Sequence, residues 1–73
     1  MNSLNPVRRI ADHFRDSIQA HERAMRDAAI DARMADLLRM VGLKPSVARL
    51  YPHELSGGMK QRVCIALSIC LSP

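Results

Sequence analysis

The stretch YPHELSGGMKQRV, residues 51–63, is the part of this chain around which the rest can be organised. A polar loop centred on Ser56, Gly57 and Gly58 leads directly into a long apolar run. Serine is a favoured residue at the cap of a helix, and glycine leaves the first-turn amides uncovered by any side chain. The pattern predicts a helix from about Gly57 to Leu71 whose positively polarised start can approach an anion such as phosphate.

A Ser-Gly-Gly triplet alone is usually a simple turn, so the longer string carries the argument. LSGGMKQR, preceded by YPHE and followed by an apolar helix, resembles the signature motif of ATP-binding cassette (ABC) transporter ATPases. The resemblance is strongest to the ATPase subunits of oligopeptide and dipeptide importers. The opening residues 1–6, MNSLNP, resemble the segment that those subunits carry shortly after their Q-loop glutamine. Both patches stand in the family's order, so the resemblance covers nearly the whole chain.

Size and composition limit the fold. Seventy-three residues make at most one small domain, in which a single apolar core seldom supplies more than ~3–5 kcal/mol. Hydrophobic residues make up 48% of the chain, yet it has one Phe, one Tyr and no Trp. The core must therefore be built from aliphatic side chains and methionine, which suit helices. We expect the chain to be all-α as it stands.

The first predicted helix runs from about Pro6 to about His21. Asn5 is a good helix cap, and proline is tolerated at the first helical position because its missing N–H would be unpaired there. On the polar side, Arg8 and Asp12 are spaced as an i,i+4 ion pair. The pattern leaves open whether this helix ends near His21 or continues toward residue 26. The apolar stripe at helical spacing consists of Val7, Ile10, Ala11, Phe14 and Ile18.

The second predicted helix ends at Gly42, where glycine can adopt a left-handed conformation and Leu43 can fold back on Leu38. We expect a short helical turn over residues 45–50. Tyr51 should be extended, because a proline follows it. The apolar stripe of the second helix consists of Ile30, Met34, Leu37, Leu38 and Val41.

The last predicted helix is apolar on almost every side beyond Arg62. A helix of that kind has to be enclosed by other protein, so we expect part of its cover in polypeptide outside these 73 residues or in a partner. Cys64 and Cys70 both lie in this run, and buried reduced thiols are expected. Neither their spacing nor that of His13 and His21 indicates a metal site.

The net charge of +4 and the pI near 9.8 raise the possibility of a nucleic-acid partner. The basic residues are spread among acidic ones, and the longest basic run is the pair Arg8-Arg9, so none is expected. No apolar stretch approaches the ~20 residues that span a bilayer, and no signal-peptide pattern opens the chain, which favours the cytoplasm. The alternative kept open is a small basic helical protein that binds nucleic acid through Arg8, Arg9, Arg15, Arg23 and Arg26.

The resemblance implies that the chain is the helical subdomain, residues 1–50, with the signature loop and helix, residues 51–73, of a P-loop α/β ABC ATPase truncated at both ends. A self-sufficient ATPase needs a phosphate loop of the form G-x-x-x-x-G-K followed by Ser or Thr, and a carboxylate that holds magnesium. The sequence has no such loop and no acidic residue after Glu54. We therefore assign no catalytic residue and no metal ligand to it, and whether it is an enzyme stays open.

In ABC ATPases, two cassettes dimerise head to tail, and the signature motif of one closes on the ATP held by the other. Carried over to this sequence, the Ser56 hydroxyl and the amides of Gly57 and Gly58 would contact the γ-phosphate of that ATP, with magnesium supplied by the partner cassette. Met59 stands where glutamine is common in the family.

The resemblance also implies a membrane permease subunit as a partner, on the inner face of the cell membrane, with residues 1–14 facing it. The transported solute would be a peptide or a similar molecule. A second alternative is a regulatory fragment that pairs with an intact cassette and blocks it.

Overall fold

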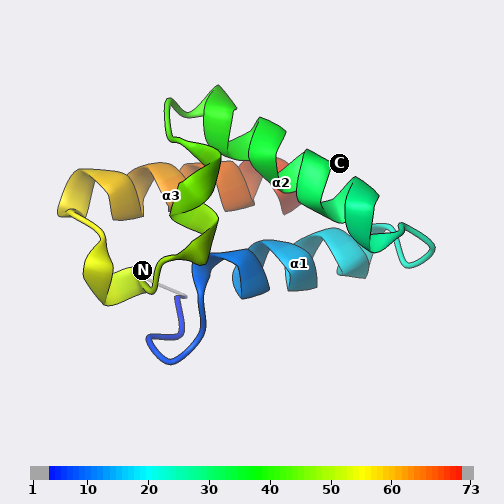
Figure 1. The fold of residues 1–73 in the computed structure, drawn as a ribbon, viewed down its shortest axis with the longest axis horizontal. Helices are drawn as coiled ribbons and strands as arrows, with labels where there is room; N and C mark the ends of the chain where they lie inside the picture. Colours follow the sequence, from blue (N-terminus) through cyan, green and yellow to red (C-terminus); the bar gives the residue numbers. More distant parts are fainter. Residues whose placement is uncertain (1–3, 72–73) are drawn as a thin grey trace.

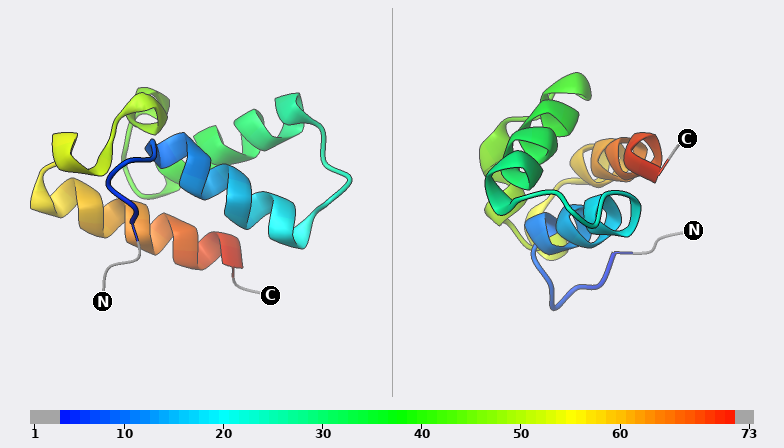
Figure 2. Two further views of the ribbon diagram at one scale, coloured as in Figure 1. Left: turned by 90° about the horizontal axis from the view of Figure 1, so that it is seen from below. Right: turned by 90° about the vertical axis from the view of Figure 1, so that its right-hand side faces the viewer.

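The computed structural model describes residues 4–71, without the side chain of Leu71. In chain order its elements are α1 (Ile10–His21), α2 (Asp27–Met40), the short 3-10 helices η1 (Pro45–Arg49) and η2 (Pro52–Glu54), and α3 (Gly57–Leu71). Residues 4–71 contain no strand, so the predicted all-α fold is confirmed. Figure 1 and Figure 2 show α1 and α3 side by side and running in the same direction, with α2 packed across both. Both helices therefore begin toward the same end of the molecule.

One apolar core joins the helices, and η1 packs onto it against α1 and α2. Phe14 is the largest side chain that is fully buried. Complete removal of such a side chain from water is worth about 1.5–3 kcal/mol, so the core is the main source of stability. The buried residues are Leu4, Ile10, Phe14, Ile18, Ile30, Met34, Leu37, Leu38, Leu43, Val47, Ala48, Leu55, Val63, Ala66, Leu67 and Cys70.

The predicted start of the first helix is wrong. The helix begins at Ile10, with Arg9 as its extended N-cap residue, and not at Pro6. The Asn5 side chain accepts a hydrogen bond from the N–H of Val7 (3.1 Å), which closes a turn in place of a helical one. Asparagine commonly bonds its own backbone two residues on, and this local bond competes with helix capping. Val7 is consequently 78% exposed and does not belong to the apolar stripe.

The first helix ends where one of the two open alternatives placed it, at His21. The N–H of Glu22 still bonds to Ile18 O (2.8 Å), and a turn then leads to Asp27 at the start of α2. Arg15 bridges this turn with ion pairs to Asp27 (3.2 Å) and to Asp31 on α2. Exposed pairs of this kind contribute about 0–1 kcal/mol each, so they orient α1 against α2 more than they stabilise it.

The C-terminal end of α2 confirms the predicted cap. Gly42 has a φ of 78°, and its N–H bonds to Arg39 O (2.9 Å). The N–H of Leu43 bonds to Leu38 O (2.9 Å), which completes a Schellman motif, and both leucines are buried in the core. The expected turn after it is present as η1, and Tyr51 is extended as predicted (φ −89°, ψ 157°).

The apolar signature helix α3 is buried on one side only. Val63, fully buried, faces the core with three further residues of the helix, whereas Ile65 is 53% and Ile69 is 37% exposed. Among residues 4–71, the other elements therefore cover the inner face of α3 and leave its outer face open to solvent. This division agrees with the expectation that the chain itself cannot enclose this helix.

Candidate functional site

The start of α3 has the predicted cap. The N–H of Met59 donates to Ser56 Oγ (3.2 Å), and the N–H of Lys60 donates to Ser56 O (2.9 Å) as the first bond of the helix. Ser56 is therefore the N-cap residue. Ser56, Gly57 and Gly58 are all exposed at this end of α3, which lies at one edge of the molecule in Figure 1.

The two glycines after Ser56 are not required by the fold that the structure describes. A Cβ added to Gly57 or Gly58 would meet no atom within 4 Å, and the positive φ in residues 4–71 belongs to Gly42. Glycine inside a helix is roughly 1 kcal/mol less favourable than alanine, so the pair weakens the first turn. The bare backbone at these positions therefore has no explanation among the described residues.

The amides of these glycines are open to an external acceptor. No hydrogen bond outside the helices, among the described residues, uses the N–H of Gly57 or Gly58. The first N–H groups of a helix have no acceptor within the helix, and they point out of its positive end. Ser56 Oγ accepts the N–H of Met59, which leaves its hydroxyl proton able to donate outward. This combination of donors suits a phosphate oxygen.

Hydrogen bonds and two buried side chains hold the segment that leads to the site, residues 51–55. The Glu54 carboxylate accepts the N–H of Tyr51 (2.9 Å), and the N–H of Leu55 bonds to Pro52 O (3.1 Å). Pro52 and Leu55 are buried. The ring of His53 stacks on that of Tyr51, with 5.7 Å between centroids and 13° between planes. This contact braces His53 against Tyr51 beside the loop.

The charge around the site is positive. The first turn of α3 holds no acidic residue, and Lys60 and Arg62 follow the glycines. The nearest preceding acid, Glu54, bonds to the backbone of Tyr51 and to neither of these basic side chains. The potential at the open end of α3 therefore favours an anion.

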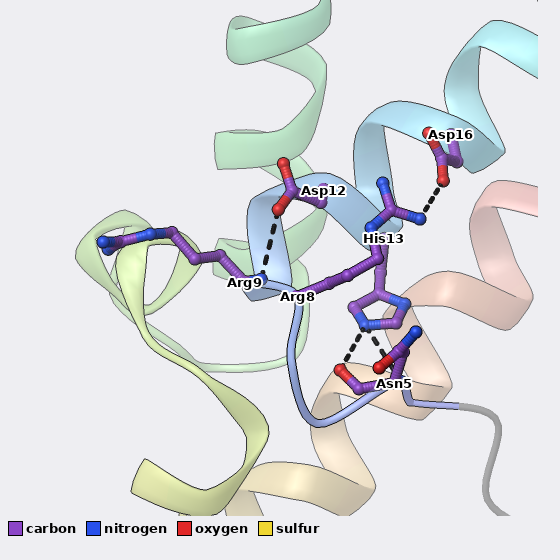
Figure 3. A network of polar contacts seen from close by, with 6 residues as sticks. All are labelled: Asn5, Arg8, Arg9, Asp12, His13 and Asp16. Atoms are coloured by element: carbon purple, nitrogen blue, oxygen red, sulfur yellow. Dashed lines mark hydrogen bonds and ion pairs between the residues drawn. The ribbon is translucent and has the colours of Figure 1, made fainter.

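A second polar network caps the start of α1 (Figure 3). The Asp12 carboxylate accepts the N–H of Arg9 (3.2 Å), and the ring Nε2 of His13 lies 3.2 Å from Asn5 N. Arg8 pairs with Asp16, one turn beyond the partner predicted for it. This pairing lowers the pKa of the Asp16 carboxyl, chiefly through the hydrogen bond from the Arg8 guanidinium. Figure 3 shows the side chains of Arg8 and Arg9 leaving the backbone in opposite directions.

Sequence reasoning missed the contact between Arg9 and Tyr51. The Arg9 guanidinium carbon lies 4.8 Å from the centre of the Tyr51 ring, and Arg9 Nη1 donates to Arg49 O (2.6 Å). From the sequence, Arg9 is expected only among the arginines of a possible nucleic-acid surface. No sequence spacing indicates a contact between residues so far apart in the chain.

The remaining candidates for chemistry lie elsewhere. Three of the arginines named for nucleic acid, Arg8, Arg9 and Arg15, are engaged within the chain. Burial raises the pKa of the Cys70 thiol, which keeps this free cysteine neutral. Within residues 4–71, no three His, Cys, Asp or Glu side chains come together in a way that could hold a metal ion. A hollow of about 330 Å³ between α1, α2 and η1 contains no residue of the signature loop in its lining, which consists of Ala11, Asp31, Met34, Ala35, Pro45, Ala48 and Arg49.

Among residues 4–71, no helix has the length and apolar character needed to cross a membrane.

Comparison with known proteins identifies the family of this chain. A sequence model of the ABC transporter family matches residues 2–73. The dipeptide transport ATP-binding protein DppD of Caldanaerobacter subterraneus subsp. tengcongensis is 44% identical over 72 residues, which is 97% of this chain and 22% of that protein. The glutathione import ATP-binding protein GsiA of Escherichia coli is 43% identical over an alignment of 75 positions that covers 100% of this chain and 12% of the relative. GsiA of Pectobacterium atrosepticum is 44% identical over 71 residues, which is 97% of this chain and 11% of the relative.

The match therefore covers nearly the whole of this chain and a small share, 11% to 22%, of these relatives. It includes the helices that the structure describes and the signature loop that joins them. The chain belongs to the ABC transporter family.

Proposed function

We propose that this chain supplies the signature motif of an ABC importer ATPase, and that Ser56, Gly57 and Gly58 contact the γ-phosphate of ATP bound to a second cassette. The observation that carries the proposal is the pair of exposed glycines for which the described chain offers no internal reason. A ligand that approaches the backbone closely supplies such a reason, because a Cβ at either position would stand between the amides and the phosphate.

This chain supplies hydrogen-bond donors to the site, and the partner cassette supplies the rest. Ser56 donates a hydrogen bond through its hydroxyl group, and the glycine amides donate hydrogen bonds through their N–H groups. The positive end of α3 favours the negative charge of the phosphate. ATP and magnesium are held by the phosphate loop and the carboxylates of the partner cassette, and no catalytic residue is assigned to this chain. ATP supplies the free energy that closes the pair of cassettes and drives transport.

The assembly we propose is a head-to-tail pair of cassettes at the inner face of the cell membrane, joined to a membrane permease. The solute is a peptide or a similar molecule, in keeping with the dipeptide and glutathione transport that the relatives' names record. The part of the chain assigned to the permease is residues 1–14, of which Met1, Asn2 and Ser3 lie outside the described residues. Cross-links from the described part, residues 4–14, to a permease would support this assignment, and cross-links confined to the far end of α2 would contradict it.

The test of the site uses an intact cassette. Placing this chain in the Caldanaerobacter relative, in place of the segment it matches, gives a chimaeric cassette that keeps the rest of that relative. Ser56→Arg fills the open end of α3 with a bulky side chain. We expect it to abolish ATP hydrolysis while the cassette still binds ATP at its own phosphate loop.

The matched control is Ser46→Arg, which introduces the same side chain at another exposed serine, in η1. We expect its turnover to stay within about twofold of the parent, because surface substitutions away from special features have small effects. Normal turnover in the Ser56→Arg chimaera would remove Ser56 from the site and overturn the proposed function.

A further inference from the structure

The start of α1 contacts residues 49–51, which lead toward the signature loop. The N–H of Ile10 donates to Leu50 O (2.8 Å), and the guanidinium of Arg9 donates to Arg49 O (2.6 Å). The same guanidinium lies over the ring of Tyr51 at 4.8 Å from its centre. A cation within about 6 Å of an aromatic face is attracted by the ring quadrupole. Arg9 therefore contacts the backbone of Arg49 and the side chain of Tyr51 at the same time.

The contact continues from Tyr51 to the signature loop through short, stiff steps. Tyr51 bonds through its N–H to Glu54, and its ring stacks on His53. The η2 turn begins with a proline, whose φ is fixed by its ring, and ends against the buried Leu55. Ser56 follows immediately. A displacement of Tyr51 therefore moves the cap of α3 instead of being absorbed by a flexible loop.

From this geometry we infer that Arg9 is a positioning residue for the signature loop. It fixes residues 49–51, and through η2 it sets where Ser56 and the glycine amides face. The inference rests on the proposed function, since the consequence is a change in how the loop meets phosphate. Arg9 also links the segment before α1 to the open end of α3. This segment contains a mostly exposed turn at residues 5–8.

Arg8 provides a matched control. It is the sequence neighbour of Arg9, has the same chemistry, and forms an ion pair with Asp16 that stays within the start of α1. Figure 3 shows that the Arg8 side chain extends toward Asp16 and away from the direction that Arg9 takes. Both arginine side chains lie at the surface, so replacing either leaves the core intact.

The experiment uses the chimaeric cassette with Arg9→Met, Arg9→Lys, Arg8→Met and Tyr51→Leu, and the Arg9→Met, Tyr51→Leu double variant. We expect Arg9→Met to lower kcat by about fivefold to tenfold, with the KM for ATP unchanged, because the closing contact in trans is displaced while ATP still binds its own phosphate loop. Arg9→Lys should restore most of kcat, since a lysine can reach the same ring and carbonyl as a cation. Hydrogen exchange in the peptide that covers residues 51–60 should rise in Arg9→Met and not in Arg8→Met.

The double variant tests whether the two side chains act together. We expect Tyr51→Leu to lower kcat as much as Arg9→Met does, and the double variant to lose no more than either single one, because residues in direct contact are not additive. Equal kcat values for Arg9→Met and Arg8→Met, or independent multiplicative losses in the double variant, would overturn the inference.

The Ser56→Arg chimaera separates this inference from the proposed function. An inactive Ser56→Arg variant beside a fully active Arg9→Met variant would overturn the role of Arg9 and leave the proposed function standing. A fully active Ser56→Arg variant would overturn the proposed function, and with it the assignment of Arg9 to phosphate contact, whatever the hydrogen exchange shows.

Discussion

Gly42 and the pair Gly57-Gly58 occupy opposite kinds of helix end, and the chain needs them for different reasons. Gly42 ends α2 at a φ of 78°, a conformation that side chains with a Cβ rarely adopt, and the hydrogen bonds around it are closed within the chain. The glycines of the signature loop open α3 without a positive φ, and a Cβ would meet nothing there. The first glycine is explained by the fold, whereas the described fold gives no reason for the pair, and the proposed contact with an external phosphate would supply one. Substitution with alanine should therefore affect stability at one end and activity at the other.

The largest expected effect is at the loop. In the chimaeric cassette, Gly58→Ala should lower ATP turnover by about a hundredfold, because the methyl group separates the amides from the phosphate they are meant to hold. The measurement is the steady-state ATPase rate, with ATP binding at the cassette's own phosphate loop as a control for folding. Turnover within twofold of the parent would mean that the bare backbone at Gly58 serves some other purpose.

Although Gly58→Ala should lower turnover, it should raise the stability of the chain of 73 residues. Alanine in the first turn of α3 is expected to add up to about 1 kcal/mol to the free energy of unfolding, because it favours the helix more than glycine does. Urea unfolding followed by circular dichroism measures this difference. A loss of stability would reveal an internal contact that the present geometry does not contain.

Gly42→Ala should reverse the pattern. Alanine in the left-handed conformation costs roughly 1–2 kcal/mol, so the free energy of unfolding should fall by about that amount. ATP turnover per folded chimaeric molecule should not change, because Gly42 lies outside the signature loop and its hydrogen bond closes within the cap of α2. A loss of turnover that exceeds the loss of folded protein would break the comparison.

The smallest effect is expected at the start of α1. The pKa of Asp16 is lowered from its usual 3.8 by Arg8, so the folded chain binds a proton there less tightly than the unfolded chain. The stability that this pair adds is present above about pH 4 and is lost as the pH falls through the folded-state pKa. Asp16→Asn should therefore slightly reduce the difference between the melting temperatures of the 73-residue chain at pH 6 and at pH 2. The substitution should have no effect on ATP turnover in the chimaera. An unchanged pH dependence would show that the ion pair contributes nothing measurable.

Local signals predicted the ends of helices where one residue decides the backbone. Ser56 as N-cap and Gly42 as C-terminal cap were both predicted correctly, because a side-chain acceptor and a missing Cβ act within a few residues. The start of α1 was predicted wrongly for the same local reason. Asn5 can cap a helix or close a turn on Val7, and the sequence does not distinguish the two.

Contacts between distant segments were beyond the reach of sequence patterns. The stacking of Arg9 on Tyr51 depends on α1 and α3 starting toward the same end of the molecule, which no periodicity specifies. The apolar pattern of α3 indicated that it needs cover, but only the packing identified Ile65 and Ile69 as the residues left outside. The identity of the phosphate that Ser56 would contact stays a prediction, since it belongs to a second molecule.

The weak first turn of α3 also bears on the reversibility of the proposed phosphate contact. Two residues without side chains lie between Leu55, which is 7% exposed, and Val63, which is fully buried, so the backbone can adjust there while both flanks stay in place. Local opening of so few residues requires far less free energy than unfolding the whole unit, and it occurs correspondingly more often. The proposed phosphate contact could therefore break and re-form repeatedly without disturbing the helix that carries it.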